Sequence, residues 1–130
     1  MAASEDRLRP PPAERFAGPE HQLDLGAEFA ALRREQHDAR DGHRQKTVYH
    51  RGSVRLVIFA FDRGGRLPQH SAPGVVTIHA IRGSVHVRTP EGDRVLDQGQ
   101  LVVLDPLVPH DVHAPAEADM LLCVALPAHA

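Results

Sequence analysis

A chain of 130 residues is long enough for one domain and short for two. Its 42% hydrophobic and 25% charged residues are typical of a globular protein, and the 4% aromatic content requires a mainly aliphatic core. A formal net charge of -2 provides no basic surface for nucleic acid, and no apolar run approaches the roughly 20 residues of a membrane-spanning helix. We therefore expect a cytoplasmic protein without nucleic-acid or membrane partners.

The N-terminal part of the chain divides into two segments. Residues 1–22 are charged and proline-rich, so we expect a flexible arm. An amphipathic helix is expected over residues 23–41, because Leu25, Phe29 and Leu32 recur at helical spacing and Asp24 stands at a capping position. Its apolar stripe is narrow, which predicts a position on the outside of the following domain or against another subunit.

Beyond Gly42 the chain consists of short runs rich in Val, Ile and Leu, separated by Gly, Pro and Asp. Many short strands with no helix between them need antiparallel pairing, and a closed or two-sheet arrangement hides their edges. The predicted fold class is all-β, a jelly-roll barrel over residues 44–128 with one N-terminal helix. The expected strands cover residues 47–50, 53–61, 75–81, 85–88, 94–96, 101–104, 111–113 and 119–126.

The strand over residues 53–61 is apolar on both faces, which suits a sheet covered on both sides. We expect Leu56 and Ile58 to face the core, and Val57, Phe59 and Phe61 to face outward. The outward side chains and the helix then provide apolar surface for a homodimer.

Six of the ten histidines fall in the barrel segment, namely His50, His70, His79, His86, His110 and His113. Most are expected to be half-exposed strand residues without a special role. The spacing of His70 and His110 relative to nearby glycines distinguishes these two.

Two blocks of this sequence resemble the cupin superfamily of RmlC-like jelly rolls. Gly64, His70 and Gly83 stand where the first cupin motif has its first glycine, its first histidine and its last glycine. Gly99 and His110 stand where the second motif has its glycine and its histidine. The resemblance implies a double-stranded β-helix in which His70 and His110 point into the interior.

The resemblance also implies a metal site, in which two histidines and a glutamate of the first motif and one histidine of the second hold a divalent ion. Here Ala72 replaces the second histidine and Val76 replaces the glutamate. The second motif's proline, glycine and asparagine positions hold Asp105, Leu107 and Ala114. The chain thus resembles a subgroup of small bacterial cupins with a degenerate first motif.

Two imidazoles alone make a poor metal site, because catalytic zinc or iron usually takes three protein ligands. The candidate metal ligands are therefore His70 and His110 together with His79 or His113, for one divalent Fe, Mn, Ni or Zn ion or for none. Strand alternation places His79 and His113 on the opposite face unless the register shifts.

Without a metal, an imidazole pair in an apolar interior suits an anionic or hydroxylated small molecule. Arg55, Arg66, Arg82 and Arg88 are candidates for charge at the mouth of the pocket, although a solvated arginine is the commoner case.

The sequence leaves three hypotheses for the function of the protein. The first is a metal-dependent cupin enzyme, an oxygenase or isomerase. The second is a metal-free barrel that binds a small molecule at His70 and His110. The third is a structural or regulatory dimer whose contact surface is the N-terminal arm and helix. A homodimer is expected under all three, and no sequence feature names the substrate.

Overall fold

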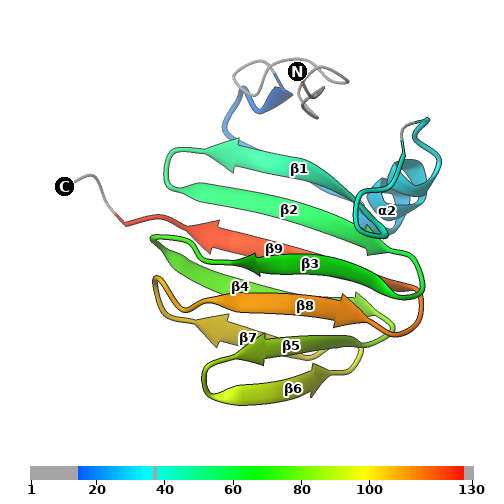
Figure 1. Cartoon of the computed structure of the whole chain (residues 1–130). Coiled ribbons are helices and arrows are strands. Elements are labelled where there is room, and N and C mark those ends of the chain that lie inside the picture. Colours follow the sequence, from blue (N-terminus) through cyan, green and yellow to red (C-terminus); the bar gives the residue numbers. More distant parts are fainter. Residues whose placement is uncertain (1–14, 37, 128–130) are drawn as a thin grey trace.

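The computed structural model describes residues 15–36 and 38–127, and two antiparallel β-sheets make up most of this part of the chain (Figure 1). The larger sheet has the strand order β1-β2-β9-β4-β7 and the smaller one the order β3-β8-β5-β6. The all-β fold class is confirmed. The larger sheet consists of β1 (His43–Arg51), β2 (Val54–Phe61), β9 (Ala118–Ala125), β4 (Val75–Arg82) and β7 (Leu101–Leu104), and the smaller of β3 (Gly65–His70), β8 (His110–Ala114), β5 (Val85–Thr89) and β6 (Gly92–Leu96).

Strand β3 was not among the expected strands. It contains Pro68 and a single large apolar residue, Leu67, so its sequence lacks the alternation that identifies a strand. Because β3 lies at the edge of the smaller sheet and pairs only with β8, the missing N–H of Pro68 interrupts no second ladder.

The core lies between the two sheets and includes Val57, Phe59 and Phe61 of β2. Ile58 and Ala60 belong to a second buried cluster on the outer face of the larger sheet. The expected orientation of β2 was therefore wrong. Alternation separates the two faces of a strand, but when both are apolar it does not show which one meets the other sheet.

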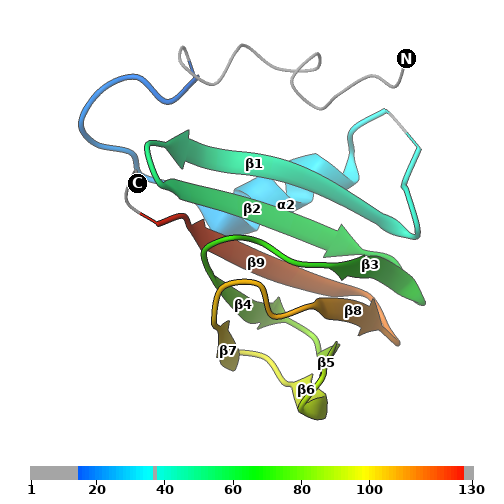
Figure 2. The same cartoon turned by 60° about the vertical axis from the view of Figure 1, so that its left-hand side comes forward.

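Helix α2 (Leu25–Arg33) covers the second cluster from outside, behind β1 and β2 in Figure 2. Its Phe29 and Leu32 are buried there, as the expected apolar stripe required. The Asp24 carboxylate accepts a hydrogen bond from the N–H of Ala27 at 3.1 Å, which confirms the predicted cap. The helix ends at Arg33, well short of residue 41, because the polar residues that follow continue no apolar stripe. Within the described residues no helix is long and apolar enough to cross a membrane.

The expected flexible arm falls partly outside the described residues, which begin at Arg15. Its described part, residues 15–22, lies against β1: Phe16 is buried and its ring centroid lies 5.6 Å from that of Tyr49. This part of the arm is therefore anchored to the outer face of the barrel.

A buried carboxylate connects α2 to the barrel. Asp119 of β9 is only 6% exposed, accepts a hydrogen bond from Arg33 of α2, and pairs with Arg82 Nε at 3.0 Å. Arg82 also reaches Glu117 at 2.9 Å. These hydrogen bonds, chiefly that to Asp119, raise the pKa of Arg82. The Arg82 guanidinium is thus paired with Asp119 and Glu117.

Candidate functional site

His70 ends β3 and His110 begins β8, and their Cα atoms are cross-strand partners. The register of this pair shifts between Leu67 and His70, so β3 holds one residue more than β8 over the same stretch. This bulge at Pro68 and Gln69 brings His70 opposite His110, but the His70 side chain stays exposed, so of the two only His110 is buried in the interior as expected.

The two imidazole rings are anchored in the same way. His70 Nδ1 lies 3.0 Å from the carbonyl oxygen of Pro68, and His110 Nδ1 lies 3.0 Å from that of Val108. Because a carbonyl oxygen only accepts, each Nδ1 carries the hydrogen and donates it. Each Nε2 then presents a lone pair, and the two Nε2 atoms lie 3.0 Å apart. Two facing lone pairs repel unless a proton or a cation lies between them or one ring gives up its Nδ1 bond.

Burial governs the charge of His110, which is 1% exposed. Desolvation lowers its pKa below 6.5, the Val108 carbonyl opposes this, and the neighbouring His70 lowers the pKa further. His110 is therefore neutral at pH 7, which disfavours a shared proton and leaves the ring in the state that coordinates metals.

A cavity of about 610 Å³ opens at the end of the barrel next to His70; we call it the mouth cavity. His70 lines it, whereas His110 lies behind His70. Ala72 and Val76 line it too, so the positions where cupins carry two further metal ligands do face this space and are apolar here. The polar lining groups are Gln45, His50, Arg55, Gln69, His70 and Ser71, and the large apolar ones include Val57, Phe59, Leu67, Leu122, Val124 and Leu126.

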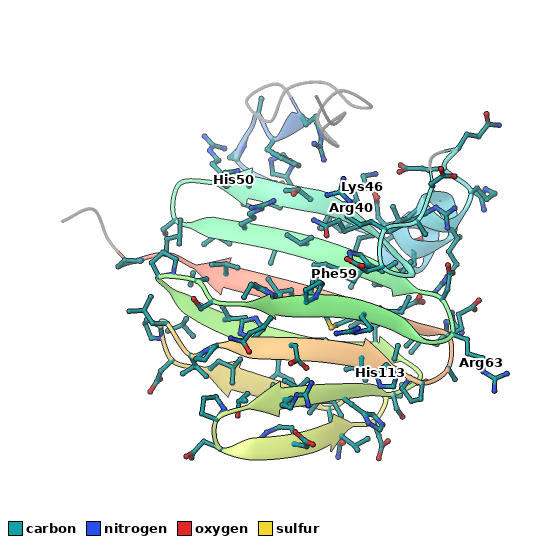
Figure 3. The ribbon with its side chains drawn as sticks, in the orientation of Figure 1. Arg40, Lys46, His50, Phe59, Arg63 and His113 are labelled. Carbon is teal, nitrogen blue, oxygen red and sulfur yellow. The ribbon has the colours of Figure 1, made fainter. Side chains whose placement is uncertain are left out.

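His50 and Gln45 are site residues that the sequence did not indicate. The register of β1 against β2 shifts between Thr47 and Tyr49, and this bulge makes His50 the partner of Arg55. In Figure 3, His50 lies near the end of β1 opposite to Arg63, and the mouth cavity lies at this end. Only the β-bulge would have indicated His50 as a site residue, and no residue around Thr47 predicts that bulge.

Of the four arginines considered for the mouth, only Arg55 lines the mouth cavity. Arg66 and Arg88 line a separate depression of about 240 Å³ on the outer face of the smaller sheet, and Arg82 belongs to the Asp119 cluster.

The structure does not bring His79 or His113 to the histidine pair. His79 pairs with Leu121, on the outer face of the larger sheet. His113 pairs with His86 in the outer depression of the smaller sheet and is labelled on β8 in Figure 3. Alternation persists through both positions, so neither ring turns inward. Within residues 15–36 and 38–127 no group of three or more His, Cys, Asp or Glu side chains is arranged to hold a metal ion.

The loop before His110 supports the alignment with the second cupin motif. Leu107, at the motif's glycine position, has a φ of 69°, in the left-handed region that glycine adopts easily. Gly83, the last glycine of the first motif, has a φ of 74°, and a Cβ there would lie 2.8 Å from the carbonyl oxygen of Glu117.

Neither a protein-family model nor a curated protein matches the sequence. Solved structures do. A conserved protein of unknown function from Streptococcus pyogenes has a TM-score of 0.69 at 26% identity, over 88% of this chain and 96% of that one. An RmlC-like cupin from Shewanella frigidimarina has a TM-score of 0.64 at 19% identity, over 69% and 81% of the two chains. A cupin superfamily protein from Desulfitobacterium hafniense has a TM-score of 0.67 at 14% identity, over 85% and 94%.

These likenesses establish a small domain with the cupin fold, as the spacing of glycines and histidines predicted. Within that fold His70 and His110 stand at two positions that resemble cupin ligand positions, and Ala72 and Val76 stand at the other two.

Proposed function

We propose that the protein binds a small molecule in the mouth cavity beside His70 and His110, with a divalent metal ion held by the Nε2 atoms of this pair. The observation that carries the proposal is the 3.0 Å separation of two Nε2 atoms whose Nδ1 atoms are both bonded to carbonyls. Metal-binding histidines are commonly oriented in this way, through a hydrogen bond from the other ring nitrogen.

The donor set fits an ion with an incomplete protein shell. Two nitrogens that each lie about 2.0–2.1 Å from one ion, at roughly a right angle, are about 3 Å apart. His70 and His110 would supply two positions, and water or the bound molecule the others. Such an ion would supply Lewis-acid chemistry, polarising a ligand oxygen and lowering the pKa of bound water. If the protein is an enzyme, oxygenase or isomerase chemistry stays the prediction.

Metal titration tests this proposal. Protein freed of metal by a chelator is titrated with Zn²⁺ or Ni²⁺ in a calorimeter, and we expect about one site per chain. His70→Ala and His110→Ala should each weaken binding at least ten-fold, while His113→Ala, an exposed histidine on the outer face, serves as the matched control. Equal binding by the wild type and the double variant would contradict the proposal.

The alternative is a metal-free binding module without catalytic activity. The apolar Ala72 and Val76 at two cupin ligand positions favour it, because two imidazoles hold an ion less firmly than a full set. This alternative predicts that a small molecule raises the melting temperature equally with and without chelator.

The homodimer needs a different surface from the one first expected, because Phe59 and Phe61 lie in the core and the apolar stripe of α2 is covered. We propose the outer face of β7, where Leu101 is 50% and Val103 57% exposed. Sedimentation should show a dimer that Val103→Glu dissociates. A wild-type chain that sediments as a monomer at micromolar concentrations refutes this surface.

A further inference from the structure

The mouth cavity contains one cationic side chain without a carboxylate partner. Arg55 Nη2 donates a hydrogen bond to Thr47 Oγ1 at 3.2 Å, and no carboxylate of the described residues pairs with this guanidinium. Arg82 and Arg88, in contrast, pair with carboxylates of neighbouring strands. The bond to Thr47 uses one of the five N–H donors of Arg55 and leaves the others for a ligand.

The β1 bulge adds an imidazole beside this guanidinium. His50 and Arg55 are direct cross-strand partners, and both line the mouth cavity. Without the extra residue in β1, Tyr49 would take this inward position, whereas in the structure Tyr49 packs outward against Phe16.

The rest of the lining determines what kind of molecule fits. Among the described residues no Asp or Glu lines the mouth cavity, so nothing there repels an anion. Much of the lining is apolar and is formed by side chains such as Val57, Phe59, Leu122 and Val124. A volume of about 610 Å³ is within the range of pockets for small organic molecules.

From this arrangement, and resting on the proposed function, we propose that the ligand is a small organic carboxylate whose acid group binds Arg55 and His50 and whose apolar part lies against the cavity walls. A guanidinium fits a carboxylate through two parallel hydrogen bonds. His70, from the opposite sheet, faces the same cavity and contacts the bound acid there.

The two nearest alternative ligands fit the lining less well. A neutral sugar makes no use of the charge of the Arg55 guanidinium, and much of the lining is apolar. A phosphate monoester carries nearly two charges and uses several donors at once, whereas this rim provides one guanidinium and one neighbouring imidazole.

Matched pairs of acids and amides test the proposal. Phenylacetate, hexanoate and octanoate are each titrated against the full chain beside their primary amides, which keep the shape and lack the charge. We expect at least one acid to bind about ten-fold or more tightly than its amide, with a preference that falls as salt rises. Arg55→Gln should abolish the preference, Arg55→Lys should retain part of it, and Arg63→Gln, at the opposite end of the barrel, should leave it unchanged.

Failure of this inference is distinguishable from failure of the proposed function. Equal binding of acids and amides, no binding of any acid, or a preference that survives Arg55→Gln overturns the carboxylate site, while the metal titration of His70 and His110 stands by itself. Conversely, if the acid preference persists in His110→Ala with no metal bound to the wild type, the carboxylate site holds and the metal proposal falls. Arg55 is exposed, so its substitutions should not disturb folding, and circular dichroism checks this.

Discussion

Replacing Leu107 reverses the usual stability order of alanine and glycine. With a φ of 69° this residue occupies the left-handed region, which costs an L-residue about 1–2 kcal/mol. Glycine avoids that cost but loses about 0.5–1 kcal/mol more chain entropy on folding than alanine. Because Leu107→Ala and Leu107→Gly both remove the side chain, their difference isolates the backbone, and we expect the glycine variant to be more stable by about 0.5–1 kcal/mol.

Urea unfolding of the two variants measures this difference, with the slope of each transition checked for equality. In a thermal scan the same difference corresponds to about 2–4 °C. Leu101 in β7 provides the control pair, since it is also exposed but extended, and there alanine should be the more stable residue. If alanine is the more stable at Leu107 too, this loop does not adopt the conformation of the cupin glycine.

The N–H of Leu107 donates a hydrogen bond to the carbonyl oxygen of Ala72 at 2.8 Å, so the loop before His110 is fixed to the loop after His70.

Two further predictions concern stability. Burial lowers the pKa of His110, so at pH values below 6.5 the unfolded chain binds more protons at this residue than the folded chain does. The contribution of His110 to the free energy of unfolding is therefore fully present above pH 6.5 and is lost as the pH falls. Urea unfolding between pH 7.5 and 5 should show this slope, and His110→Gln should flatten it. Asp119→Asn replaces the buried carboxylate that pairs with Arg33 and Arg82 by a neutral amide and should lower the free energy of unfolding by about 2–3 kcal/mol. Asp111→Asn, at a more exposed ion pair, should lower it by less than about 1 kcal/mol. A similar loss for both variants would contradict a stabilising role of the Asp119 cluster.

The resemblance to the two cupin motifs singled out His70 and His110 from the sequence, and the structure makes these two residues cross-strand partners. Gly64 and Gly83, which carry part of that resemblance, both adopt the left-handed conformation that favours glycine for a steric reason. Alternation likewise predicted that His79 and His113 face away from the pair, and the structure agrees.

The rest of the site depends on bulges, which follow from the pairing of two strands and not from either strand alone. One extra residue near Pro68 and another near Thr47 change which side chains lie opposite the neighbouring strand. As a result His70 is the cross-strand partner of His110, and His50 is that of Arg55. Pro68 was a usable signal, because proline within a strand is confined to edges and bulges. No comparable residue marks the bulge in β1. The orientation of β2 could not be predicted either, because helix α2, which covers the outer face of the larger sheet, is remote from β2 in sequence.

One measurable coupling decides whether the ligand binds beside His70 and His110 with or without a metal ion. An ion held by these two histidines would have further coordination positions that only water or the bound molecule could fill. A carboxylate or other donor that reaches the ion strengthens ion binding by the same factor by which the ion strengthens carboxylate binding. The Zn²⁺ affinity measured with and without saturating octanoate therefore decides the question: at least a five-fold gain, about 1 kcal/mol, is expected if the carboxylate that binds Arg55 also reaches the ion. Equal affinities, with both ligands bound, would show that the anion end of the mouth cavity works without the histidine pair.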